Sequence, residues 1–309
     1  MTPEGHPDLP GRLNNLGNSF YRRFERTGDL DNLSEAIRNL QCAVQSTPDG
    51  HPELPSQLNN LGTSFCRRFE CTGDLDDLSK AIRNQQRAVQ STPDGHADLP
   101  TLLNNLGNSF CHRFESTGDL DDVSEAIRNL QRAVQATPDG HPDLPAWLNN
   151  LGNSFVCRFE HTGHLEDLSE AIRNQQRAVE SIPDEPSLPG RLNNLGNSFC
   201  CRFERNGDLG DVSEAIRNQQ RAVNLTLDDD PFLPAWLTNL GTSLSCRFES
   251  TGDLDDLSEA IRNQQRAVQL TPHGRPSLPA LLNNLGTSFL CHFGHTNDLD
   301  DLSEAIRNH

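Results

Sequence analysis

Residues 9–50 read LPGRLNNLGNSFYRRFERTGDLDNLSEAIRNLQCAVQSTPDG, and close copies of this segment fill the rest of the 309-residue chain. Every copy carries a Leu-Gly pair, and successive pairs lie 44 or 45 residues apart, with the glycines at Gly17, Gly62, Gly107, Gly152, Gly196, Gly241 and Gly286. A period of this length is typical of solenoids and other repeat arrays. The sequence therefore predicts a single array over residues 1–309, with repeats at about 9–53, 54–98, 99–143, 144–187, 188–232, 233–277 and, truncated, 278–309.

Two amphipathic helices are predicted in each repeat. Leu9-Pro10 opens helix A, because proline is tolerated in a first turn, and Thr27-Gly28 ends it, because glycine readily adopts a left-handed conformation. The apolar stripe of helix A recurs at steps of three and four residues, at Leu13, Leu16, Phe20 and Phe24. Helix B begins with carboxylates at the positive end of its dipole, Asp29 and Asp31, and its apolar stripe comprises Leu30, Leu33, Ile37 and Val44.

Composition agrees with a repeat array. Only 34% of the residues are hydrophobic and the mean hydropathy is -0.64, so the apolar side chains must be spread over many small interfaces. No segment shows the alternation of a β-strand. The predicted fold class is all-α, a solenoid of helix A and helix B hairpins, and the resemblance to a known repeat family given next implies a right-handed superhelix.

The order Leu16-Gly17, Phe20, Ala36, Leu40, Ala43, Pro48 is similar to the signature of the tetratricopeptide repeat (TPR), with longer helices and connections. The segment HPELPSQLNNLG at residues 51–62 resembles the long repeats of the kinesin light chain type. The string RFExTGDLxDLSEAI resembles arrays in fungal proteins that carry a caspase-like CHAT domain or an NTPase switch domain elsewhere. The likeness covers essentially the whole chain. HEAT or armadillo repeats, of similar length, are the weaker alternative.

One position of helix B departs from the TPR pattern, and the sequence does not determine how helix B packs there. Where the first repeat has Leu40, later repeats have a polar residue, at Gln85, Gln175, Gln219 and Gln264. The chain also begins inside a turn between repeats and stops within a helix B, without the polar capping helices that solenoids need. We therefore expect it to be a fragment of a longer array.

A second stripe of helix A is turned away from the apolar one, and the TPR resemblance implies that it lines the concave groove. Two of its columns stay polar, at Asn14, Asn59, Asn104, Asn149, Asn193, Thr238 and Asn283, and one turn later at Asn18, Thr63, Asn108, Asn153, Asn197, Thr242 and Thr287. An asparagine amide both donates and accepts, so this ladder is predicted to bind the backbone of an extended peptide. The alternative is that these side chains hydrogen-bond neighbouring helices and hold the array together.

The columns that vary most between repeats are predicted to set specificity, through Tyr21, Arg22, Cys66, Arg67, Cys111, His112, Trp147, Val156, Cys157, Trp236 and Cys246. The alternative is free drift of solvent-exposed positions. A glutamate column at the end of the stripe favours a basic or neutral ligand, unless it is only a solvated charged face, at Glu25, Glu70, Glu115, Glu160, Glu204 and Glu249.

Catalytic residues, metal ligands and cofactors are not predicted. A repeat spreads polar residues along the array, whereas catalysis needs a nucleophile, a base and an orienting group in one pocket. None of the nine cysteines has Cys-x-x-Cys spacing, so they are interpreted as reduced thiols. The Cys157, Cys201, Cys246 and Cys291 column should be too widely spaced for disulfides. The histidines before the A helices are interpreted as turn residues, at His6, His51, His96 and His141.

The formal net charge of -18 argues against nucleic acid as a partner, since phosphate binding depends on Lys and Arg. No apolar run is long enough to span a membrane, and the N-terminus does not resemble a signal peptide, so a cytoplasmic location is expected.

The sequence as a whole predicts a non-catalytic scaffold that binds a protein or an extended peptide in the helix A groove. The alternative is a ligand-sensing regulatory arm of a larger CHAT protease-like or NTPase switch protein, whose enzyme domain would be an intramolecular partner. A third interpretation is a decaying gene fragment without a function of its own.

Overall fold

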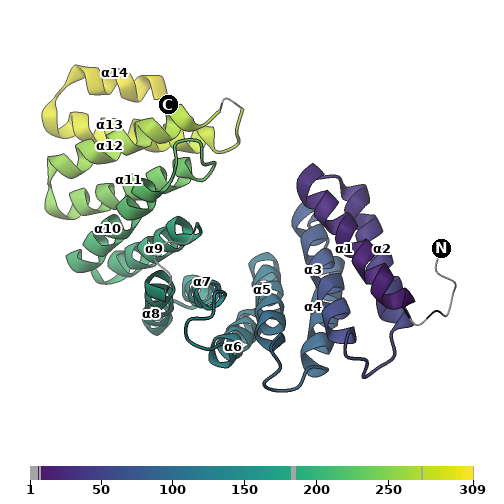
Figure 1. The fold of residues 1–309 in the computed structure, drawn as a ribbon. Helices are drawn as coiled ribbons and strands as arrows, with labels where there is room; N and C mark the ends of the chain where they lie inside the picture. Colours follow the sequence, from purple (N-terminus) through teal and green to yellow (C-terminus); the bar gives the residue numbers. More distant parts are fainter. Residues whose placement is uncertain (1–5, 7, 182–185, 273, 309) are drawn as a thin grey trace. The chain divides into compact units, whose positions relative to one another are not determined.

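The computed structural model describes residues 6, 8–181, 186–272 and 274–308, and helices are the only regular elements in this part of the chain (Figure 1). The A helices are α1 Leu9–Thr27, α3 Leu54–Thr72, α5 Leu99–Thr117, α7 Leu144–Thr162, α9 Leu188–Asn206, α11 Leu233–Thr251 and α13 Leu278–Thr296. The B helices are α2 Leu30–Ser46, α4 Leu75–Gln90, α6 Leu120–Ala136, α8 Leu165–Ser181, α10 Leu209–Leu225, α12 Leu254–Leu270 and α14 Leu299–Asn308. The predicted all-α fold class is confirmed, and each A helix begins at the leucine that opens a repeat.

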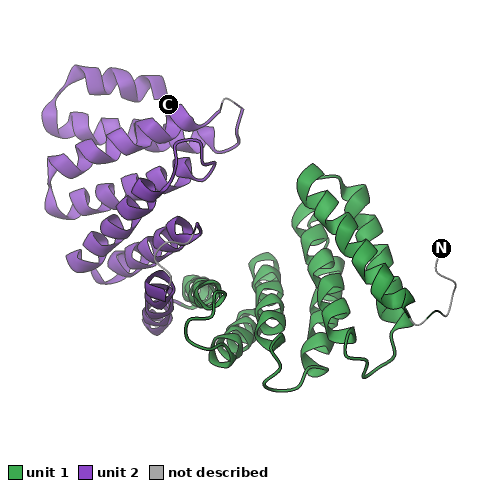
Figure 2. Ribbon diagram, viewed as in Figure 1, with its two compact units in different colours: residues 1–162 green, residues 163–309 purple. Residues whose placement is uncertain are grey.

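The helices form two compact units, residues 1–162 and residues 163–309 (Figure 2). In the first unit, α1/α2, α3/α4 and α5/α6 are hairpins, and each B helix also packs against the following A helix. In the second unit, α8 packs against α9, and α9/α10, α11/α12 and α13/α14 are hairpins. Successive A helices also contact one another directly, from α1 to α7 in the first unit and between α9 and α11 in the second.

The predicted boundary between the two helices of a repeat is confirmed. Gly28 ends α1 in the left-handed conformation, with φ of 68°, and its N–H donates to Phe24 O. Asp29 then caps α2, because its side chain accepts a 3.1 Å hydrogen bond from Asp31 N. The same turn recurs along the chain, and in the seventh repeat Asn297 takes the place of the glycine with φ of 57°.

The core consists of separate clusters, each made by the helices of two neighbouring repeats. In one, Phe24 and Ile37 of the first repeat pack with Phe65 of the second. The predicted apolar stripes are wrong at two positions. Leu16 is 46% exposed, because α1 is the first described helix and has no preceding B helix like the one that packs on the equivalent Leu61. Leu30 is also half exposed, because it is the first residue of α2 and lies beside the hairpin turn at the edge of the interface.

The packing of helix B at the glutamine positions, left open by the sequence, follows from a close approach of the two helices. A Cβ atom on Gly17 would lie 2.7 Å from Leu40 Cγ, and one on Gly62 would lie 2.7 Å from Gln85 Cγ. The stem of Gln85 therefore fills the place of the leucine, and the residue is 2% exposed. Its amide is consequently buried between α3 and α4, where it needs hydrogen-bond partners.

An ion pair joins the two helices of most repeats. Arg113 Nε donates to Asp122 Oδ2 at 2.7 Å, and the equivalent bond between Arg202 and Asp211 measures 2.8 Å. Each aspartate is buried and each arginine forms two hydrogen bonds with it. In the seventh repeat a histidine stands in place of the arginine, and His292 Nδ1 lies 2.6 Å from the equivalent carboxylate.

Candidate functional site

The first predicted asparagine column joins neighbouring A helices. Asn60 Nδ2 donates to Asn14 Oδ1 at 3.1 Å, and the equivalent bonds are Asn105 to Asn59 at 3.1 Å, Asn150 to Asn104 at 3.0 Å and Asn239 to Asn193 at 2.9 Å. Asn104 and Asn193 are only 3% exposed, whereas Asn149 is half-buried and Asn283 is exposed. Thr238 differs, since its hydroxyl donates to Pro234 O within its own helix. The bonded asparagines of this column therefore hold the A helices together, as the structural alternative expects.

The second column reaches the surface. Asn18, Thr63, Asn108, Asn153 and Asn197 are half-buried, and Thr242 and Thr287 are exposed. The last two hydroxyls donate to the backbone of their own helices. In the first unit this column supplies polar groups to a hollow on the A-helix surface.

This hollow, the A-helix pocket, has a volume of about 380 Å³ and lies among α1, α3, α4 and α5. It brings together six of the predicted site residues, Tyr21, Thr63, Cys66, Arg67, Asn108 and His112. The other lining residues are Glu25, Glu70, Gln85, Asn105 and Ser109. Side chains separated by one or two repeats in the sequence thus share one small concavity, which is the usual setting for ligand binding.

Charged groups in and beside the A-helix pocket are arranged around Glu70. Arg67 forms an ion pair with Glu70 through Oε2, and Oε1 of the same carboxylate lies 3.5 Å from His112 Nε2. His112 Nδ1 lies 3.6 Å from Glu115 Oε2, and this interaction is the main reason that the pKa of His112 is raised. Burial raises the pKa of the neighbouring Cys66 thiol to about 11. The pocket is therefore acidic overall, with cationic groups already paired.

Two buried polar atoms of pocket residues, Gln85 Oε1 and Ser109 Oγ, have no hydrogen-bond partner among the described residues. In the fifth repeat the equivalent Gln219 is satisfied, since Ser243 Oγ donates to its Oε1 at 2.6 Å and its Nε2 donates to Asn197 Oδ1 at 3.0 Å. The second repeat has Thr63 in place of that asparagine, whereas Ser109, the equivalent of Ser243, is present but makes no such bond. A buried acceptor without a hydrogen bond costs about 1–3 kcal/mol, so a ligand donor at Gln85 would recover free energy.

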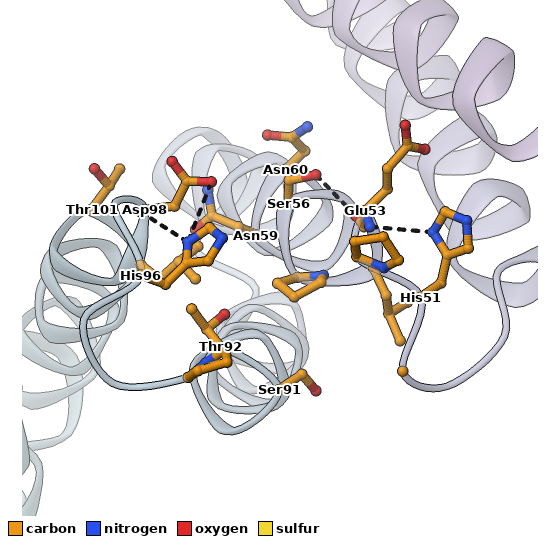
Figure 3. A pocket seen from close by; sticks show the side chains of 16 residues that line it. His51, Glu53, Ser56, Asn59, Asn60, Ser91, Thr92, His96, Asp98 and Thr101 are labelled. Atoms are coloured by element: carbon orange, nitrogen blue, oxygen red, sulfur yellow. Dashed lines mark hydrogen bonds and ion pairs between the residues drawn. The ribbon is translucent and has the colours of Figure 1, made fainter.

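A larger hollow of about 600 Å³, the turn pocket, lies where the turns meet the ends of α3 and α5 and was not predicted (Figure 3). His51 Nδ1 accepts from Glu53 N at 3.2 Å and His96 Nδ1 accepts from Asp98 N at 3.2 Å, which confirms the predicted turn role of these histidines (Figure 3). Equivalent residues line a hollow of about 380 Å³ one repeat earlier. The repeated spacing of His-Pro and Leu-Pro pairs in the turns is the sequence signal that could have predicted the turn pocket.

The turn pocket is less suited than the A-helix pocket to recognise a polar ligand. Leu54 and Leu102 form part of its wall together with prolines. Two of its hydroxyl groups are already used, since Ser56 Oγ donates to Glu53 O and Thr92 Oγ1 donates to Ala88 O. The A-helix pocket is therefore the candidate functional site, although it is the smaller of the two.

The remaining predicted specificity residues lie outside both pockets. Trp147 is buried, and Trp236 stacks on Phe232 with 5.8 Å between ring centroids. Their column is partly internal, as Gln57 of the same column accepts a 2.6 Å hydrogen bond from Thr47. Arg22 is exposed, and Cys111, Val156, Cys157 and Cys246 are half-buried. Sequence periodicity placed all these positions on the A helices. It could not tell which of them the next repeat would cover.

The nine cysteines are all free. Cys111 Sγ lies 3.0 Å from Ser154 Oγ, and Cys200 Sγ lies 2.8 Å from Ser243 Oγ, so these thiols contact the next A helix instead of each other. Among the helices that the structure describes, none is long and apolar enough to cross a membrane.

No family model and no curated protein matches the sequence. Among solved structures, the C-terminal part of a TPR repeat-containing protein from Cytophaga hutchinsonii is 12% identical, with a TM-score of 0.62 over 97% of this chain and 93% of that one. A putative kinesin light chain from Podospora anserina with nearly identical TPR-like repeats is 17% identical, with a TM-score of 0.50 over 72% of this chain and 99% of that one. A STAND signal transduction ATPase with a TPR sensor, from Pyrococcus horikoshii, is 12% identical, with a TM-score of 0.67 over 98% of this chain and 41% of that one.

Proposed function

We propose that this chain, whose fold is that of the TPR arrays, is a non-catalytic scaffold that binds a protein or peptide and uses the A-helix pocket as part of its binding surface. The observation that carries the proposal is the convergence of six predicted site residues on that pocket. The nine free thiols favour a reducing compartment such as the cytoplasm.

The chemistry of the pocket favours an extended peptide segment that is basic or neutral. Asn108 and Thr63 offer donors and acceptors for a peptide backbone, and the unpartnered Gln85 Oε1 accepts from a ligand N–H. Glu25 and Glu70 line the same wall and repel an anionic ligand. The formal net charge of -18 has the same sign as nucleic acid, which is therefore a poor partner.

A second candidate is a sensor arm within a longer switch protein. It is favoured by the likeness to the STAND ATPase, in which a TPR sensor accompanies other domains and this chain spans 41% of the length. In that case the same pocket would bind the sensed ligand or an enzyme domain of the same polypeptide. The two candidates share the binding surface and differ only in what is attached to it.

The test is a selection of peptides from a displayed random library on the purified chain, followed by affinity measurements. Peptides that use the pocket should bind at least about tenfold more weakly to a Tyr21→Ala, Asn108→Ala double variant, because a contact surface and a hydrogen bond are lost. Arg83→Ala, at an exposed position of α4 outside the pocket, is the matched control and should bind normally. Equal affinities for all three proteins, or no selected peptide, would refute the proposal.

A further inference from the structure

Three potential metal ligands converge at one wall of the A-helix pocket. One ligand atom from each of Cys66, Glu70 and His112 lies within 4.8 Å of the other two. Cys66 and Glu70 are four residues apart and therefore share one face of α3, and His112 comes from α5. We propose that these three side chains bind a transition-metal cation of the Zn²⁺ class, with an open coordination position facing the pocket.

The donor set selects the class of ion. A thiolate, an imidazole and a carboxylate are ligands of Zn²⁺ and related borderline metals, whereas Ca²⁺ and Mg²⁺ require oxygen ligands. In a tetrahedral zinc site with bonds of about 2.0–2.3 Å, neighbouring ligand atoms lie about 3.3–3.7 Å apart. The three ligand atoms lie within 4.8 Å of one another, so displacements of roughly an ångström separate them from that spacing.

The carboxylates around His112 are arranged as they are around a metal-binding histidine. Its Nε2 faces Glu70 Oε1 at 3.5 Å, and its Nδ1 faces Glu115 Oε2 at 3.6 Å. In most protein metal sites the second nitrogen of a ligating histidine donates to a carboxylate, which fixes the tautomer and the ring orientation. Glu115 is therefore the positioning residue, and Nε2 is the nitrogen that binds the ion.

The charges around the site permit a cation. Arg67 pairs with Oε2 of Glu70, so Oε1 can bind the ion while the ion pair persists. Glu25 and Glu115 add two further carboxylates to this surface. Burial keeps the Cys66 thiol protonated, so binding breaks the S–H bond, forms the S–metal bond and releases one proton to solvent.

An independent observation points to a ligand in the same A-helix pocket. Gln85 is 2% exposed, lines the pocket, and its Oε1 lacks a hydrogen bond from any described residue. A water molecule or a peptide group in the fourth coordination position is a donor for this acceptor. Three protein ligands with one exchangeable position are typical of zinc sites that engage a further ligand. The ion would thus give the pocket a point of attachment for a peptide side chain.

No recognised motif marks this group in the sequence, because two ligands come from one repeat and the third from the next. In the equivalent columns one repeat later, the residues are Cys111, Glu115 and Cys157, so a cysteine stands in place of the histidine. Cys111 is therefore the matched control for Cys66. Ion binding needs no peptide, so the inference stands or falls separately from the scaffold function.

The test is a Co²⁺ titration of the full chain followed by displacement with Zn²⁺, with circular dichroism to verify folding. We expect one bound equivalent with a thiolate-to-cobalt charge-transfer band and the visible absorption of a tetrahedral site. Cys66→Ser should abolish the charge-transfer band, and His112→Gln should weaken binding at least about tenfold. Glu115→Gln should weaken binding about tenfold and retain the band, since it only orients the histidine.

Cys111→Ser should titrate like the unaltered chain. The inference is overturned if the unaltered chain binds no stoichiometric Co²⁺, or if the charge-transfer band persists in folded Cys66→Ser. Retained ion binding by a chain that selects no peptide would support the metal site and count only against the scaffold function.

Discussion

Asn60 donates a 3.1 Å hydrogen bond to Asn14, one residue earlier in the preceding repeat, and thereby ties α3 to α1. The same bond joins Asn105 to Asn59, Asn150 to Asn104 and Asn239 to Asn193. Two adjacent columns of asparagines thus serve the packing of neighbouring A helices. In the function that we propose, the next column along the helix supplies the binding groups.

Loss of one such bond should lower stability. In Asn150→Ala the carboxamide oxygen of Asn104, a residue that is 3% exposed, loses its donor, and we expect a destabilisation of about 1–3 kcal/mol. The measurement is urea denaturation followed by circular dichroism. Asn284→Ala is the control, because this residue of the same column is exposed, and its effect should stay within about 0.5 kcal/mol. Equal effects of the two substitutions would contradict the ladder.

The helix contact at the Leu-Gly pair predicts a steric effect. A Cβ on Gly107 would lie 2.7 Å from Leu130 Cγ and 3.2 Å from Ala126 O, so Gly107→Ala should destabilise the chain by about 1–3 kcal/mol. Gly190 is also helical, but the nearest atom to its added Cβ is Trp236 Cζ2 at 4.0 Å. Gly190→Ala should therefore be neutral or stabilising, because alanine favours helices. The measurement is thermal unfolding of both variants. A Gly107→Ala protein as stable as the unaltered chain would be evidence against the close approach of α5 and α6.

The buried ion pairs predict a loss of stability in acid. Burial alone would raise the pKa of Asp211, but hydrogen bonds from Arg202 and Asn206 outweigh it and lower that pKa. A carboxylate with a lowered pKa in the folded state stabilises it above about pH 4 and loses this effect as the pH falls through the folded-state value. The difference in unfolding midpoint between the unaltered chain and Asp211→Asn should therefore be large at pH 7 and shrink below about pH 4. A difference that is independent of pH would refute this account.

Thiol reactivity should separate the cysteines into two groups. Burial raises the pKa of Cys111 to about 11 and that of Cys200 to about 12, so less than about one in a thousand of these thiols is ionised at pH 8. Cys42 and Cys71 are exposed. Under limited iodoacetamide at pH 8, mass spectrometry should find Cys42 and Cys71 modified at least about tenfold faster. Similar rates for Cys111 and Cys42 would show that the buried thiols open readily to solvent.

The repeat period and the spacing of apolar residues were sufficient to predict the helices, because these are local properties. The turn at Gly28 and Asp29 was predicted for the same reason. Exposure at Leu16 and Leu30 could not be predicted, because it depends on which helix lies opposite.

The candidate site was only partly predictable. Periodicity selected Asn108 and His112 as surface residues of helix A, and both line the pocket. It could not distinguish Asn104, which faces the next helix, from Asn108, which faces the hollow. Gln85 was noticed only as a departure from the usual leucine, because the hydrogen bonding of its amide depends on contacts between neighbouring helices. Such groups become visible only when neighbouring repeats are placed together.

The central claim is that the A-helix pocket is part of the ligand-binding surface, and a crystal structure of the chain with a library-selected peptide tests it most directly. We predict peptide density among α1, α3 and α5, with peptide groups hydrogen-bonded to Asn108 and Gln85. A peptide bound only in the turn pocket beside His51 and His96, or on the B helices, with the A-helix pocket empty, would contradict the claim.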